Sequence, residues 1–270
     1  MLEGHWLFHR LGPAFVDQLV RRCQETLGVE RERLVALPSY RLAALALNGV
    51  DRDVALAGRD GPSTLLDLSG GDAQPPDFWR ALLHSFNTND CFGDVRPVDY
   101  CQPTAAHHQA LDAALAVLKE GAPHTHAAIT AWIPRILVVQ GGPQSGSSPR
   151  FFGCILMPTN AFEIAPGLLA ADLVHEMAHQ ELFVLNAYDR LVSPHADETW
   201  RFSIFAGIPR PTMGRFHAAH ALFRLVQFSR QTGTGAFVRR GKLWRMRRSF
   251  RPGELTPLGR LIVHDVYPRA

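Results

Sequence analysis

The sequence predicts an α+β protein that is mostly helical, with a small sheet packed beside two long helices of the second half. Several long segments have apolar residues at helical spacing. Two short runs, Arg135–Val139 and Phe151–Met157, are apolar, partly β-branched and flanked by turn residues, which is typical of strands. One of the long helices, expected within Leu168–Ala187, contains a His-Glu-x-x-His motif that begins at His175. Together these observations favour a layered arrangement of helix and sheet.

The first half of the chain is predicted to be mainly helical. Helical periodicity is present in Pro13–Leu27, in Arg31–Val50 as one or two helices, in Asp77–Phe86 and in Thr104–Lys119. In the last of these segments, the expected buried side consists of Leu111, Ala114, Leu115 and Leu118. Gly58–Pro76 and Asp90–Pro103 are rich in turn residues and are expected to be irregular.

In the second half, the two predicted strands are separated by Gly141–Pro149, which is expected to be a flexible loop. Met213–Arg230 is the second long helix. Phe237–Trp244 and Leu261–Val266 are interpreted as further strands. Because no clean linker is visible, we expect residues 1–270 to form a single domain, with a helical N-terminal part, 1–130, and a metal-binding part, 131–270.

The composition is that of an ordinary globular protein. Hydrophobic residues make up 46% and charged residues 20% of the 270 residues. No run approaches the roughly 18 to 20 apolar residues of a membrane span. The start of the chain lacks the features of a secretory signal, so we expect a cytoplasmic protein without a membrane partner. Its four cysteines have no Cys-x-x-Cys spacing and are expected to be free thiols.

A cluster of seven basic residues lies between Arg239 and Arg251, although the formal net charge is only +3. One interpretation is a solvated face. The other is a docking surface for an acidic peptide or nucleic acid. No nucleic-acid-binding motif accompanies the cluster, so we do not expect a nucleic-acid partner.

The His-Glu-x-x-His motif is the clearest chemical signal. His175 and His179 are four residues apart, so on a helix both imidazoles lie on one face and can bind the same divalent metal. In a zinc peptidase, the intervening Glu176 is the general base that activates a metal-bound water.

A third protein ligand must come from further along the chain, and the sequence leaves it open. The residues after His179 contain no glycine or histidine in the metzincin pattern, which excludes that class. Glu198, nineteen residues after His179, has the separation of a thermolysin-like ligand, but its neighbours lack the Asn-Glu-x-x-x-Asp pattern. The other candidates are Asp189, interpreted as a helix cap, His195 in a loop, and His217 and His220 in the second long helix.

The chain resembles a known family, the α-ketoglutarate-dependent HExxH-type peptide β-hydroxylases of bacterial natural-product clusters. The resemblance rests on three elements in the same order: the His175–His179 motif, Ser193-Pro194, and Arg210-Pro-Thr-Met-Gly-Arg-Phe-His217. It covers about residues 150–230 and does not extend to residues 1–130. The fifteen residues between Pro194 and Arg210 form a longer connection than the family usually has.

The resemblance implies an enzyme that uses iron(II), α-ketoglutarate and O₂ to hydroxylate a β-carbon of a peptide, for example a ribosomal precursor. It implies that His175, His179 and His217 bind the iron, leaving three positions for α-ketoglutarate and O₂. Arg210 or Arg215 would bind the distal carboxylate of α-ketoglutarate, with Arg210 favoured. Glu176 would then orient a ligand or a bound water.

Two other functions are kept as alternatives. The first is a zinc-dependent metallopeptidase with Glu176 as base and Glu198 as third ligand. The second is a non-enzymatic peptide-binding module that uses the basic segment Arg239–Arg251. Metal analysis separates the second from both enzymes, and substitution of Glu198 or His217 separates the two enzymes from each other.

Overall fold

The computed structural model describes residues 12–35, 64–65, 83, 98–133, 135–141, 145–149, 152–204, 207–233 and 240–267. These residues are mostly helical and include a small mixed sheet, which confirms the predicted fold class. Among them, no helix combines the length and the apolar character that crossing a membrane requires.

The main sheet is built around two parallel strands, β3 (Arg135–Gln140) and β5 (Cys154–Pro158). Their register pairs Arg135 with Cys154 and Val139 with Pro158. On the far side of β3, β1 (Thr64–Leu65) pairs in parallel and β2 (Asp99–Tyr100) antiparallel. On the other side, β4 (Gly146–Ser147) pairs antiparallel with β5 and forms the edge of the described sheet.

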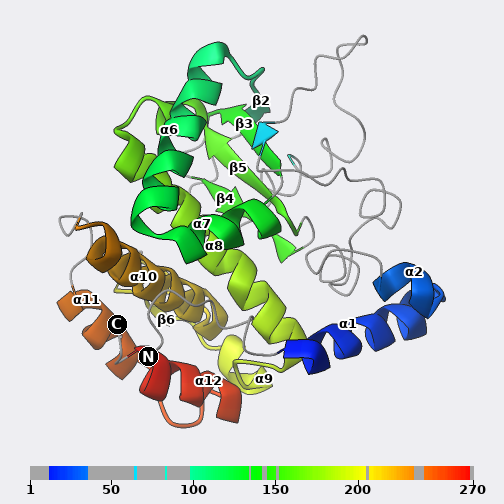
Figure 1. Ribbon diagram of the computed structural model, residues 1–270. Helices are drawn as coiled ribbons and strands as arrows, with labels where there is room; N and C mark the ends of the chain where they lie inside the picture. The colour runs from blue at the N-terminus through cyan, green and yellow to red at the C-terminus, as the bar shows by residue number, and fades with distance from the viewer. Residues whose placement is uncertain are drawn as a thin grey trace.

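Both faces of the central strands are buried. Alternate side chains of a strand point to opposite faces, so Ile136 and Ile155 belong to the large core cluster with the helices, whereas Leu137 and Leu156 belong to a small cluster on the opposite face. The helices over the first face are α6 (Ala105–Gly121) and α8 (Pro166–Tyr188). The sheet therefore supports α8, the helix that carries the motif (Figure 1).

The ends of the long helices follow from local chemistry. Thr104 caps α6 and forms a reciprocal capping box with His107. α8 begins with proline at its first position, where a backbone N–H is not needed. α10 (Thr212–Thr232) ends at Gly233, whose φ of 67° is left-handed and favours glycine.

The helix α10 lies between α8 and the C-terminal helices in Figure 1. The C-terminal elements are α11 (Arg240–Arg248), α12 (Pro257–Leu261) and the π-helical turn η5 (Ile262–Val266). Together with residues of α10 they form a second apolar core. Between α8 and α10 the chain forms α9 (Pro194–Asp197) and a hairpin of β6 (Arg201–Phe202) and β7 (Pro209–Arg210).

The remaining described elements are α1 (Gly12–Leu27), α2 (Arg31–Val35), α7 (Pro123–Trp132) and the 3-10 turn η4 (Thr159–Phe162). The helices expected in Pro13–Leu27 and Thr104–Lys119 are confirmed by α1 and α6. The helices expected after Val35 and in Asp77–Phe86 lie outside the described residues, apart from Leu83. The described cysteines, Cys23, Cys101 and Cys154, are free thiols.

Two strand predictions at the C-terminal end are wrong. Phe237–Trp244 contributes to the helix α11 from Arg240 onward, and Leu261–Val266 is helical. In α11 the buried residues Leu243 and Met246 are three apart, the spacing of one helix face packed on the α10 core. The expected loops also contain the two-residue strands β1, β2 and β4, because pairing with β3 or β5 is a tertiary effect.

Candidate metal centre

The helix α8 brings the two motif histidines together as its geometry requires. The Nε2 atoms of His175 and His179 are 3.0 Å apart. Two donors at right angles on a metal with bonds of about 2.1 Å have this separation, about 3.0 Å. The ligand atoms of His175, Glu176 and His179 all lie within 4.8 Å of one another, which makes this group a candidate metal site.

The helix α10 supplies a third imidazole, that of His217. Its Nδ1 atom lies 2.9 Å from Nδ1 of His179, and the ring of Phe183 packs against it with a centroid distance of 5.1 Å. His179 is therefore the middle of a row of three histidines. For His217 to share one ion with the other two, its ring and that of His179 must turn so that one nitrogen of each faces the same point.

All three imidazoles are kept neutral. Burial lowers the pKa of His175 to about 4 and that of His217 to about 3. The pKa of His179 is well below its ordinary value, mainly because of burial and then because His175 and His217 are close. A neutral imidazole offers the lone pair that a metal needs, so the three donors are in the correct protonation state at neutral pH.

Glu176 is the second unusual group of the site. Its side chain is buried, with 1% of the residue exposed, and within the described part of the chain its Oε2 accepts no hydrogen bond. Burial raises the pKa of Glu176 to about 7, although Ser147 and Ser145 beside it act in the opposite direction. The carboxyl group therefore lies between α8 and the edge strand β4, where burial favours its protonated form.

Arg210 lies at the same site, at the end of β7. A Cβ atom on Gly214 would be 3.5 Å from Cβ and 3.6 Å from Cδ of Arg210, so the arginine side chain runs along the first turn of α10. After burial, which is the main cause, the positive charge of Arg210 is among the causes that lower the pKa of His179 and His217. A cationic group is thus placed beside the neutral histidines.

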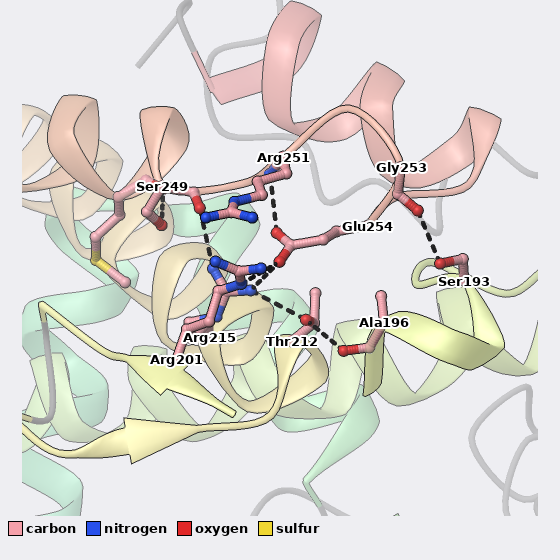
Figure 2. A network of polar contacts seen from close by, with 10 residues as sticks. Ser193, Ala196, Arg201, Thr212, Arg215, Ser249, Arg251, Gly253 and Glu254 are labelled. Carbon is pink, nitrogen blue, oxygen red and sulfur yellow. Dashed lines mark hydrogen bonds and ion pairs between the residues drawn. The ribbon is translucent and has the colours of Figure 1, made fainter. Parts of the chain in front are cut away.

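Arg215, the alternative anion-binding residue, is not brought to the histidines. Its guanidinium pairs with Glu254 at 3.0 Å and donates to the carbonyl of Ser249 at 3.1 Å and to Oγ1 of Thr212 at 3.0 Å (Figure 2). Residues two apart on a helix point about 200° apart, so Arg215 faces away from His217. Arg215 is therefore assigned to the packing of the C-terminal segment rather than to the candidate site.

The other candidate ligands also lie elsewhere. His220 is buried with its Nε2 2.6 Å from Oε2 of Glu181 and its Nδ1 3.2 Å from the hydroxyl of Tyr267. Glu198 and His195 are exposed, Glu198 as the residue that ends α9. Asp189 is the C-terminal cap of α8, as the sequence indicates.

The donor set fits a first-row metal ion such as iron(II) or zinc. It offers two nitrogen atoms at a suitable separation, a third imidazole next to them and a carboxylate oxygen without a hydrogen-bond partner among the described residues. Sequence reasoning missed the position of Ser145 and Ser147 beside Glu176, because their segment has the composition of a loop. It also missed the partner of Glu181, a charged residue in an apolar helix that signals a buried ion pair.

Comparison with protein-family models and with curated proteins finds no match to this chain.

Proposed function

We propose that the protein is an iron(II)- and α-ketoglutarate-dependent oxygenase that hydroxylates a β-carbon of a peptide. The observation that carries the proposal is the position of Arg210 beside the neutral imidazoles of His179 on α8 and His217 on α10. In a hydrolytic metal site a cation beside the metal is optional, and where present it stabilises the negative charge that develops on the substrate oxygen. A cosubstrate with a second carboxylate does need one, and a guanidinium binds a carboxylate with two parallel hydrogen bonds.

Each residue has a defined part in this proposal. His175, His179 and His217 would hold iron(II), which together with α-ketoglutarate and O₂ supplies the oxidising chemistry for inserting a hydroxyl group into a C–H bond. Arg210 would bind and orient the distal carboxylate of α-ketoglutarate. Phe183, packed on His217, would fix the imidazole and exclude water from that side. Glu176 would hold a proton or a bound water beside the metal ligands.

A zinc-dependent peptidase is the second candidate, and a specific observation favours it. The pKa of Glu176, raised by burial to about 7, suits a general base that accepts and returns a proton at neutral pH. Glu198, the third ligand expected for that class, is exposed and outside the candidate site. A peptidase would therefore have to use His217 in its place.

Turnover of α-ketoglutarate tests the proposal. Protein loaded with iron(II) is mixed with α-ketoglutarate, O₂ and a library of synthetic peptides. We expect succinate and CO₂, together with peptides that gain one oxygen atom by mass spectrometry. Cleavage of the library by the zinc-loaded protein, with no consumption of α-ketoglutarate by the iron form, would establish the peptidase instead.

Two arginine variants provide a matched control. Arg210→Lys should weaken α-ketoglutarate binding about 10-fold or more, because lysine cannot make the two parallel hydrogen bonds of a guanidinium. Arg215 lies five residues later, in the first turn of α10, and pairs with Glu254, so Arg215→Lys should leave that affinity unchanged while lowering the thermal stability. Equal effects of the two variants on α-ketoglutarate binding would remove Arg210 from the proposed site.

A further inference from the structure

A second polar cluster joins α8 to α10, beyond the histidines. Glu181 of α8 pairs with Arg224 of α10 through two contacts, 2.6 Å from Oε1 to Nη2 and 2.8 Å from Oε2 to Nε. His220 approaches the same carboxylate at 2.6 Å and the hydroxyl of Tyr267 at 3.2 Å. We call Glu181, His220, Arg224 and Tyr267 the interhelix clamp.

The clamp and the histidines lie on two flanks of one helix contact. Glu181 follows His179 by two residues, so the two side chains point about 200° apart around α8. Both nevertheless contact α10, through Arg224 and His217 respectively. The helix α10 must therefore pack between them. The apolar residues of this contact include Leu182, Leu185, Ala218 and Leu222.

The two kinds of contact constrain the helices differently. Apolar side chains hold two helices together, but dispersion and burial are not directional, so they do not by themselves select one orientation of the two helices. A guanidinium that binds a carboxylate through two hydrogen bonds fixes both the distance and the relative orientation of the two groups, and so of the helices that carry them. Here the bidentate ion pair is buried, with Glu181 at 0% and Arg224 at 4% exposure, so water does not compete for its hydrogen bonds.

The carboxylate of the clamp has partners on both of its oxygen atoms. Nη2 of Arg224 donates to Oε1, whereas Nε of Arg224 and Nε2 of His220 both lie within hydrogen-bond distance of Oε2. His220 is three residues after His217, within one turn of the same rigid helix. A shift of α10 at the clamp therefore moves His217 by a similar amount.

We propose that the interhelix clamp positions His217 against His179, and that Glu181 and Arg224 are positioning residues of the metal centre. The proposal rests on the metal-binding part of the proposed function and not on the oxygenase chemistry. The clamp touches neither metal nor substrate. It sets how close α10 comes to α8, and so whether the third imidazole reaches the other two.

The chain offers a matched control in the other buried arginine–glutamate pair of α10. Arg215 and Glu254 are also buried and paired, but they tie α10 to the C-terminal segment and not to α8 (Figure 2). Loss of either pair should lower the stability. Only loss of the clamp should alter the geometry of the three histidines.

Binding of cobalt(II) and zinc(II) to the whole protein tests the proposal. Glu181→Gln should weaken both metals about 10-fold or more and change the visible spectrum of the cobalt form, because a nitrogen donor is displaced. Glu254→Gln should lower the melting temperature and leave metal affinity within about 2-fold. Equal weakening of metal binding by both variants would mean a general structural effect and would overturn the proposal.

A double variant separates positioning from stability. Replacing both charges in Glu181→Met, Arg224→Met restores much of the lost stability, because replacing a buried ion pair by apolar groups is often neutral. Metal affinity should stay weakened, since the directional contact is gone. Return of wild-type affinity together with stability would overturn the proposal. If Glu181→Gln does not fold, Arg224→Lys keeps the positive charge but loses the pair of directed hydrogen bonds to Glu181, and an unchanged cobalt spectrum in that variant would contradict the proposal.

Failure of this proposal is distinct from failure of the proposed function. If the wild-type protein binds neither cobalt nor zinc, the metal centre itself is refuted, and the clamp's role with it. If the wild-type protein binds them and Glu181→Gln binds them equally well, only the clamp is refuted.

Discussion

The helix α10 has a polar region on each of two opposite faces, and the buried charges in these regions are handled differently. Around Arg215 and Glu254, guanidinium groups surround the carboxylate: Nη2 of Arg215 is 3.0 Å and Nε of Arg201 is 2.8 Å from Oε1. Around His217, the structure brings together neutral imidazoles and the carboxyl of Glu176, which has no ion-pair partner among the described residues.

The two glutamates show the consequence. Both are buried, yet the pKa of Glu176 is raised by burial to about 7, whereas that of Glu254 is lowered. Burial acts upward on Glu254 as well, but the backbone N–H of Arg251 and the arginines outweigh it. A buried polar group without a partner costs free energy. At Glu254 the arginines and the backbone N–H offset this cost and lower the pKa, whereas at Glu176 Ser145 and Ser147 act in the same direction without overcoming burial, and this difference supports the proposed ligand beside Glu176.

The largest expected effect that tests this contrast comes from His179→Ala. His179 contacts both other histidines, so its loss should weaken zinc or iron binding by more than about 1000-fold, beyond the roughly 10- to 100-fold typical of residues that only support a ligand. Metal content after dialysis measures this. The exposed His195→Ala is the control and should retain wild-type metal content.

The second effect separates two candidate ligands. His217→Ala should weaken metal binding about 100-fold, since one of three nitrogen donors is lost. Glu198→Ala should change nothing, because its side chain is exposed and outside the site. Competition with a chromophoric chelator gives both affinities. The reverse order would assign the third position to Glu198 and support the peptidase.

The third effect concerns the paired region. Glu254→Gln should lower the free energy of unfolding by about 2 kcal/mol, less than the loss typical of a fully buried pair, because Arg201 is partly exposed. Urea unfolding followed by circular dichroism measures this. No change in stability would mean that the network contributes nothing net and that the contrast between the two regions is wrong.

The smallest effect is that the loss of unfolding free energy caused by Glu254→Gln should depend on pH. The pKa of Glu254 in the folded protein is below its ordinary value of 4.5, so the unfolded chain takes up the proton first as the pH falls. The stability that ionised Glu254 contributes is fully present above about pH 4.5 and is lost as the pH falls through the lower folded pKa. The difference between wild type and Glu254→Gln should therefore shrink in unfolding experiments below about pH 4.5, and a constant difference would contradict the ion pair.

The sequence predicted the elements that rest on a long local pattern. The helices α8 and α10 were expected because their apolar spacing extends over many residues, and the strands β3 and β5 because short apolar, partly β-branched runs are flanked there by turn residues. The short strands β1, β2 and β4 were missed because their conformation depends on pairing partners distant in sequence. The C-terminal segments were assigned as strands because short apolar runs do not distinguish a strand from a helix packed on a core.

The same distinction applies to the candidate site. The pairing of His175 with His179 follows from four-residue spacing on one helix. The direction of Arg215 also follows from helical geometry, since a residue two positions from His217 on the same helix points to a different face. The pairing of Glu181 with Arg224 does not follow from local spacing, because it depends on how two helices cross.

Anaerobic titration of the iron(II)-loaded protein with α-ketoglutarate measures whether iron and Arg210 together bind this cosubstrate. We expect saturable binding with a new visible absorption band that requires iron, is abolished by His179→Ala and is weakened by Arg210→Lys. Binding of α-ketoglutarate that is equally strong without iron, or no binding by the iron-loaded protein, would contradict the proposed oxygenase.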